Sequence, residues 1–168
     1  SAGVNSSDIE VNIKIGLGAA IAAGKLNTPA RNALLVSMTD EVAEKCLWNN
    51  RQQSLASSLA TRDSLPRLGY LSRLMQVRED RGLLNRALED LPDEDVLVER
   101  QMAGGGLERP EVSVLLSYAK IALSADLMQG ALADDPAFEP LLLEYFPSAM
   151  QANYRDEILG HRLRKEII

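Results

Sequence analysis

The residues that most often carry chemistry are scarce in this sequence, which has one histidine and one cysteine. His161 is a candidate general base, since imidazole titrates near neutral pH. It has no evident partner in the sequence, and the neighbouring Arg162, Arg164 and Lys165 would oppose its protonation. We therefore expect His161 to have a structural or surface role.

Cys46 falls on the predicted inward-facing apolar stripe of a helix, together with Val42, Leu47, Leu55 and Leu59. A reactive thiol needs cationic neighbours, and Lys45 is the only one nearby. We therefore interpret Cys46 as a buried structural thiol. A single cysteine also excludes an internal disulfide and a thiolate zinc site within one chain.

Two sets of glycines have the wrong context for binding phosphates. The run at residues 104–106 lacks the Lys-Ser/Thr ending of a phosphate loop, and no strand precedes it. Gly16, Gly18 and Gly24 lie inside an apolar stretch, not between a strand and a helix as in a dinucleotide fingerprint. We interpret both sets as structural and predict no cofactor-binding residue in this chain.

An acidic cluster precedes one of the predicted helices. Its members are Asp90, Asp93, Glu94 and Asp95. A calcium loop would need a twelve-residue frame with a central glycine and a closing glutamate, and that frame is absent. Acidic residues are favourable at the start of a helix, where they complement the helix dipole. The sequence therefore predicts no metal site and no self-contained catalytic site.

The composition indicates a helical globular chain. Among its 168 residues, 46% are hydrophobic and 25% are charged, which is ordinary for a folded domain. Aromatic residues reach only 4%, while leucine and alanine are abundant, so helix packing is favoured over a β-sandwich.

The charge pattern argues against nucleic acid and membrane as partners. The net charge is −6, and the only concentrated basic stretch is residues 161–165, whereas phosphate binding needs clustered cations. No apolar run approaches the roughly 20 residues that span a bilayer. The first fifteen residues carry Asp8, Glu10 and Lys14, unlike a secretory signal. We expect a soluble, cytoplasmic protein.

Hydrophobic periodicity predicts an all-α fold, with about eight helices in an irregular array. After the first segment, the helical patterns cover residues 28–38, 39–59, 64–81, 83–91, 92–102, 109 to a stop at 134–136, 141–146, and 148 to the end. No repeat of fixed period is visible, so a solenoid is not indicated.

The first segment can be read in two ways. From Ile9 to Ile15 apolar and polar residues alternate, as in a strand, but from Ile9 to Ile21 every fourth residue is apolar, as in a helix. No hairpin signal follows, so we predict a helix that continues to Leu26. The expected capping residue is one of Ser6, Ser7 and Asp8.

Several stretches carry information beyond their hydrophobic periodicity. They are SAGVNSSDIEVNIKI at residues 1–15, MTDEVA at 38–43, RPE at 109–111, YAKI at 118–121, YFP at 145–147 and HRLRKEII at 161–168. In this collinear order they closely resemble the segment that follows the dinucleotide domain in the large bacterial NAD-dependent glutamate dehydrogenases. Glu108 departs from the resemblance, since threonine is expected there; this bears only on helix capping.

The resemblance implies a much longer parent enzyme that oxidises L-glutamate to 2-oxoglutarate and ammonia with NAD. Its catalytic lysine and aspartate and its Rossmann domain would lie upstream of Ser1. The absent initiator methionine and the apolar end at Ile167 and Ile168 also suggest an excised piece. Residues 1–26 would then be a helix leaving the catalytic domain, and residues 27–168 a C-terminal helical domain. The upstream domains and a homo-oligomeric parent are the implied partners.

The resemblance also implies a site at the start of the chain. Smaller glutamate dehydrogenases have a Gly-Gly-Val-x-x-Ser turn, in which the valine packs on the substrate's aliphatic stem and the serine binds its side-chain carboxylate. The matching positions here are Gly3, Val4 and Ser7, with Ala2 in place of the first glycine. A hydroxyl backed by free amides at a helix start suits a carboxylate. The alternative is that Ser7 only caps the helix.

A second function class is an autonomous helical interaction or regulatory module. The apolar first helix and the isoleucines at the chain end would give such a module a surface for a partner. The collinear resemblance along the whole chain favours the dehydrogenase interpretation. In that interpretation this chain contributes scaffold and one edge of the glutamate pocket, and it is inactive alone.

Overall fold

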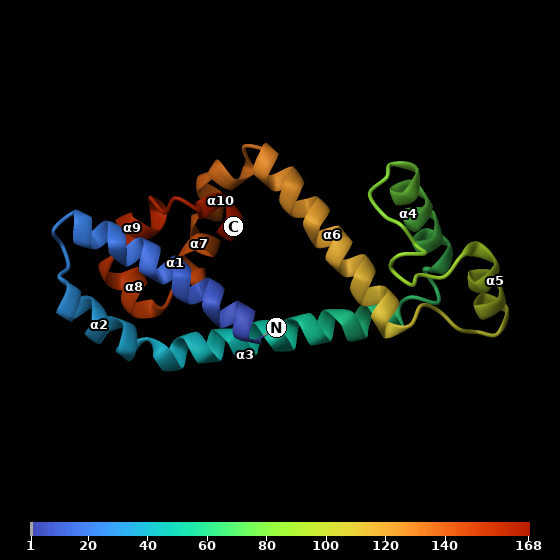
Figure 1. Cartoon of the computed structure of the whole chain (residues 1–168), viewed down its shortest axis with the longest axis horizontal. Coiled ribbons are helices and arrows are strands. Elements are labelled where there is room, and N and C mark those ends of the chain that lie inside the picture. The colour runs from blue at the N-terminus through green and yellow to red at the C-terminus, as the bar shows by residue number, and fades with distance from the viewer. Residues whose placement is uncertain (1) are drawn as a thin grey trace. The chain divides into compact units, whose positions relative to one another are not determined.

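The computed structural model describes residues 2–168, with side chains from Val4 onward. All regular structure in this range is helical, which confirms the all-α prediction (Figure 1). The α-helices are α1 (Ala2–Ala22), α2 (Thr28–Ser37), α3 (Thr39–Arg62), α4 (Leu68–Asp80), α5 (Glu94–Met102), α6 (Arg109–Gln129), α7 (Glu139–Tyr145), α8 (Ser148–Asn153), α9 (Arg155–Leu159) and α10 (Arg164–Ile167). Two short 3-10 helices, η1 (Leu132–Asp134) and η2 (Pro136–Phe138), precede α7.

The chain forms two compact units. The first unit comprises the described residues up to Arg51 together with Ser124–Ile168, and the second unit comprises Gln52–Leu123. The glycines at residues 104–106 therefore lie inside the second unit. The division at residue 26 concerns the domains of a longer parent and stays a prediction.

The core of the first unit is built around α1. Ile9, Ile13 and Leu17 form a buried stripe at four-residue spacing and pack with Leu142 and Phe146 from the C-terminal part of the chain. The helical interpretation of this segment is thus confirmed, except that the helix ends at Ala22 instead of Leu26; Gly24 follows with a left-handed φ of 72°. α9 contacts both α1 and α7, so the start of the chain is held by its end.

The predicted cap of α1 is wrong. The helix begins at Ala2, so Ser6, Ser7 and Asp8 lie in its interior. No proline occurs near Asn5, so no residue there prevents the helix from extending towards the N-terminus.

Two of the motifs behind the resemblance meet in the first unit. The Glu41 carboxylate of α3 accepts hydrogen bonds from the Ser148 backbone N–H at 2.9 and 3.0 Å and from the Ser148 hydroxyl at 2.8 Å. One turn later, Lys45 Nζ donates to the Glu144 carbonyl at 2.6 Å. Glu41 thus satisfies an N-terminal amide of α8 that has no partner within its own helix. Glu41 of the MTDEVA motif and Lys45 thus bind the residues on either side of the YFP motif.

The second unit packs α4 and α5 against the first half of α6, around Leu68, Met75, Leu97 and Val112. Glu111 secures the start of α6, since its carboxylate accepts from the Glu108 backbone N–H at 2.6 Å and from Arg100 Nη1 at 2.7 Å. This is one half of a capping box, and it needs no threonine at position 108.

Three expectations about helices need correction. Residues 83–91 form turns instead of a helix, because Gly82 and Asp90 adopt left-handed backbone angles, with φ of 65° and 52°, and Pro92 follows. The single helix expected after Ser148 is divided into α8, α9 and α10. On α3 the predicted inward stripe is only partly buried: Cys46 is buried, whereas Leu47, Leu55 and Leu59 are exposed.

Candidate functional site

Gly3, Val4 and Ser7 lie within two turns of one another on α1. Helix geometry places positions 4 and 7 nearly opposite the stripe of Ile9 and Ile13. The Val4 side chain is 68% exposed, and Ser7 is exposed as well. The structure therefore leaves Val4 and Ser7 accessible to whatever adjoins this face of α1.

The free amides expected behind the Ser7 hydroxyl are not available. An interior residue of an α-helix donates its N–H to the carbonyl four residues earlier, and Ser7 is such a residue. The Ser7 side chain is therefore neither a cap nor part of a helix-terminus anion site. If this residue binds a carboxylate, the hydroxyl alone makes the contact from this helix.

The charges around this part of α1 do not attract a carboxylate. Asp8 and Glu10 are acidic, and Lys14 forms an ion pair with Glu10 one turn away. A glutamate side chain needs a cation for strong binding, because hydrogen bonds that pair opposite charges are about twice as strong as neutral ones. Such a cation would have to come from another part of a longer protein.

A groove of about 450 Å³ lies next to this region, where α1 meets α2 and α3. Its polar contributors from α1 are Ser6 and Glu10, while Val36 and Val42 are among its apolar ones. The remaining lining residues are Ile13, Leu35, Met38, Thr39 and Ala43. No cationic side chain lines it, so it suits an apolar group better than an anion. The sequence motif did not indicate this groove, because its walls come from three helices.

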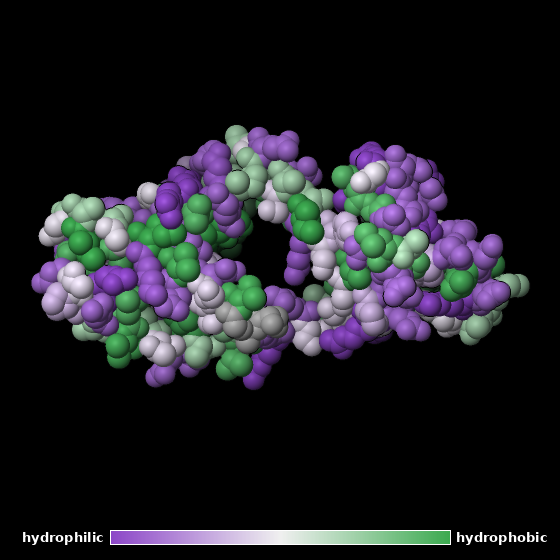
Figure 2. All heavy atoms as spheres, viewed as in Figure 1, coloured by the Kyte–Doolittle hydropathy of each residue, from purple (hydrophilic) through white to green (hydrophobic). Residues whose placement is uncertain are grey.

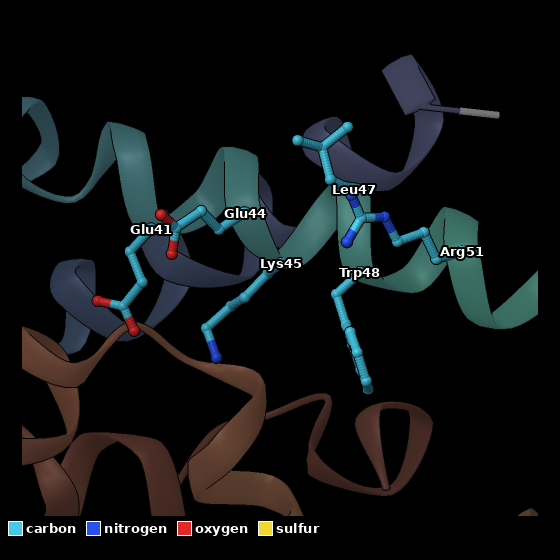
Figure 3. A pocket seen from close by; sticks show the side chains of 6 residues that line it. All are labelled: Glu41, Glu44, Lys45, Leu47, Trp48 and Arg51. Carbon is cyan, nitrogen blue, oxygen red and sulfur yellow. The ribbon is translucent and has the colours of Figure 1, made fainter.

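A second hollow, of about 550 Å³, runs along α3 (Figure 3). Its lining residues are Glu41, Glu44, Lys45, Leu47, Trp48 and Arg51. In Figure 3, Lys45 and Trp48 point towards the C-terminal helices, and the Trp48 side chain is 60% exposed. The two acids and two bases lie on one helix, and Glu41 and Lys45 are engaged in the structural contacts described above. The hollow holds no arrangement of a nucleophile with a base.

His161 is buried, with 3% of its surface exposed, and it joins the end of the chain to α1. Its Nε2 lies 3.1 Å from the Asn12 carbonyl, and its Nδ1 accepts from the Leu163 backbone N–H at 3.1 Å. Nε2 therefore carries the proton and donates to Asn12, which makes the ring neutral. The ring also packs against Phe146, with centroids 5.6 Å apart. Asn12, the hydrogen-bond partner that the sequence did not reveal, is 149 residues away from His161, and these contacts are structural.

The pKa of His161 lies below its ordinary value of 6.5. Burial is the main cause and Arg162 adds to it, while the Asn12 carbonyl and Glu166 act in the opposite direction. A proton on Nδ1 would also face the Leu163 N–H, which now donates to that nitrogen. The folded state therefore binds this proton less readily than the unfolded chain does.

A pH dependence of stability follows. The unfolded chain takes up the proton near pH 6.5 and the folded chain only at lower pH, so stability is full above that value and declines as the pH falls through this window. We expect denaturant unfolding to show a loss of stability as the pH falls below 6.5 that is smaller in His161→Gln. Equal pH dependence in both proteins would show that His161 is not the titrating group.

The remaining sequence candidates have structural surroundings. Cys46 is buried in the first unit's core, as expected. Asp93 caps α5 by accepting from the Val96 backbone N–H at 3.0 Å, which agrees with the helix-start interpretation of the acidic cluster. Within residues 2–168 as described, no group of three or more metal-ligating side chains comes together. No helix in that range is long and apolar enough to cross a membrane.

The glycines of the first segment do not fit a dinucleotide. Gly16 and Gly18 lie inside α1, and Gly24 is in the turn that follows, with φ of 72°. Dinucleotide phosphates are bound where a strand leads into a helix N-terminus, and none of these glycines stands at such a junction. These three glycines therefore form no dinucleotide-binding turn.

Comparison with known proteins covers both ends of the chain and nearly all of its length. A family model described as "Bacterial NAD-glutamate dehydrogenase, catalytic domain" matches residues 1–60, and one described as "Glutamate dehydrogenase, C-terminal" matches residues 104–168. NAD-specific glutamate dehydrogenases from Pseudomonas aeruginosa and Mycobacterium tuberculosis are 45% and 38% identical over 99% and 100% of this chain. A third, from Halomonas elongata, is 42% identical over 99%. The chain spans about 10% of the length of each of these relatives.

Proposed function

We infer that this chain, a segment of the kind found in the large bacterial NAD-dependent glutamate dehydrogenases, serves in a parent enzyme that oxidises L-glutamate. The observation that carries the inference is the match of 45% identity over 99% of the chain to an enzyme named NAD-specific glutamate dehydrogenase. The two family models agree with it from the two ends of the chain. The same collinear match favours this function over an autonomous interaction module.

In the proposed reaction, L-glutamate, NAD and water give 2-oxoglutarate, ammonium, NADH and a proton. When bound, NAD accepts the hydride from the substrate's α-carbon. Because the described residues do not fit a dinucleotide, we assign NAD binding and proton transfer to other parts of the parent. This chain then contributes scaffold and one edge of the substrate pocket.

The proposed edge of the pocket is formed by Gly3, Val4 and Ser7. Val4 is an exposed apolar side chain, which suits contact with the methylene groups of glutamate. Ser7 is exposed one turn later, at a distance along the helix of about 4.5 Å, so both could touch the same small substrate. The core stripe of α1 fixes this face by anchoring the helix to α9.

The resemblance further suggests a homo-oligomeric parent located in the cytoplasm. The chain's single cysteine suits a reducing compartment, where disulfides are rare. The analytical test of the oligomeric state is sedimentation of the parent at several concentrations.

The proposed function predicts glutamate-dependent formation of NADH by the purified parent. We expect turnover with L-glutamate and NAD, and none when this 168-residue chain replaces the parent, because the described residues are all helical and offer no strand-to-helix turn for a dinucleotide. Initial rates with L-aspartate and with NADP in place of the two substrates serve as controls for specificity. A parent that reduces NAD equally well with and without L-glutamate would contradict the proposal.

A further inference from the structure

α1 carries a second uncharged stripe on the face away from the core. We call this the outer stripe; it consists of Val11, Ile15, Gly18 and Ala22, and it continues beyond Val4 and Ser7 of the proposed pocket edge. The spacing of three or four residues places them along one side of the helix. Val11 is 50% exposed, and Gly18 and Ala22 are exposed as well. Figure 2 shows hydrophobic residues at the surface over α1 and α2, between hydrophilic ones.

Such a face is unusual for a helix that borders solvent. A surface helix normally presents charged and polar residues opposite its buried stripe, whereas a helix that is apolar all round is buried on all sides. The charged residues of α1 within the described range are Asp8, Glu10 and Lys14, and all three lie outside the outer stripe. Gly18 has open space where a Cβ would be, so another surface can approach the backbone closely there.

The matches with known proteins indicate what covers this face. Residues 1–60, and therefore all of α1, match a catalytic-domain model, yet the chain is only about 10% of the length of its relatives. Most of the polypeptide that could cover the outer stripe therefore lies outside these 168 residues.

We propose that the outer stripe packs against an apolar surface of the rest of the catalytic domain, in the same polypeptide. α1 is then a central helix with two buried sides, one in the core of the first unit and one against that domain. The proposal rests on the proposed function, since it requires a parent that contains a catalytic domain. To the proposed function, the proposal adds the surface through which the C-terminal helices are joined to the catalytic domain.

The test measures thiol labelling in the full-length parent with Val11→Cys. Val11 is not among the proposed pocket residues, and cysteine is small enough to be accommodated in an interface. The matched control is Met102→Cys, which replaces an 86% exposed side chain on a helix outside both matched regions. Maleimide modification of each peptide is followed by mass spectrometry, in native and in urea-unfolded protein.

We expect native labelling at position 11 to be at least about tenfold slower than in the unfolded chain, with little slowing at position 102. The slowing should not depend on protein concentration, because the covering surface belongs to the same chain. Labelling at position 11 that is slowed less than this, or no more than at position 102, overturns the proposal. Protection that appears only at high concentration also overturns it and identifies a second copy as the occupant.

The labelling result is separate from the activity result. A parent that oxidises glutamate but labels freely at Val11→Cys rejects the docking surface and leaves the proposed function intact. A parent with a protected position 11 but no glutamate-dependent activity rejects the function instead.

Discussion

Replacement of Phe146 by alanine should lower the free energy of unfolding of the 168-residue chain by about 3–5 kcal/mol. Phe146 is fully buried and lies at the centre of the first unit's core. Its ring meets Tyr145 edge-on at a centroid distance of 5.2 Å and also contacts His161. Alanine would leave a cavity that borders α1, so the loss combines hydrophobic transfer with missing contacts.

The matched control is Leu141→Ala on α7, where the side chain is exposed. We expect the control to change the stability by less than about 0.5 kcal/mol. Urea unfolding curves of both variants and of the unsubstituted chain provide the comparison. A loss of under about 1 kcal/mol for Phe146→Ala would mean that the core is not centred on this ring.

Ser7→Ala in the parent should raise the KM for L-glutamate about ten- to a hundredfold and leave the KM for NAD nearly unchanged. The reason is the loss of a hydrogen bond to a charged group, worth about 1.5–3 kcal/mol. Because Ser7 lies inside α1 and is exposed, alanine should not weaken the helix and should favour it by about 0.5 kcal/mol. A melting curve of the same variant separates the two effects.

Ser58→Ala is the control for this prediction. Ser58 is also an exposed serine inside a helix, and its hydroxyl donates to the Ser54 carbonyl at 2.9 Å. We expect no change in either KM. If Ser7→Ala also leaves the KM for glutamate unchanged, the carry-over of Ser7 from the smaller enzymes is wrong, and the pocket edge must be sought elsewhere.

The sequence predicted those parts of the fold that depend on periodicity and local signals. The four-residue spacing of Ile9, Ile13 and Leu17 indicated α1 correctly, because these side chains need a common core. Asp93 indicated the start of α5, because a cap bonds to an amide three residues away. Both inferences use interactions within a few residues of the chain.

The predictions from sequence were wrong where the local structure depends on contacts between distant residues or on the backbone angles of a single residue. No local pattern shows that residue 90 adopts a left-handed conformation, or that Glu79 accepts from the Arg86 backbone N–H at 2.9 Å and holds the turn. Asn12, which accepts a hydrogen bond from His161, and Glu41, which accepts one from Ser148, lie more than 100 residues away from them along the chain.

The candidate site was predictable only in part. The resemblance implies Gly3, Val4 and Ser7 as the pocket edge, which stays a prediction, and the structure places the last two on an exposed face of α1. The sequence also suggested a helix start at Ser7, where capping and carboxylate binding would compete. Because α1 begins at Ala2, Ser7 does not cap the helix. The effect of Ser7→Ala on the KM for glutamate can therefore be interpreted independently of its effect on stability.

The central claim is that this chain serves in an enzyme that converts L-glutamate to 2-oxoglutarate with NAD. Its most direct test is a product analysis of the purified parent incubated with L-glutamate and NAD. The claim predicts that 2-oxoglutarate, ammonium and NADH form in equal amounts. NADH formed without 2-oxoglutarate, or no product at all from folded parent, would contradict it.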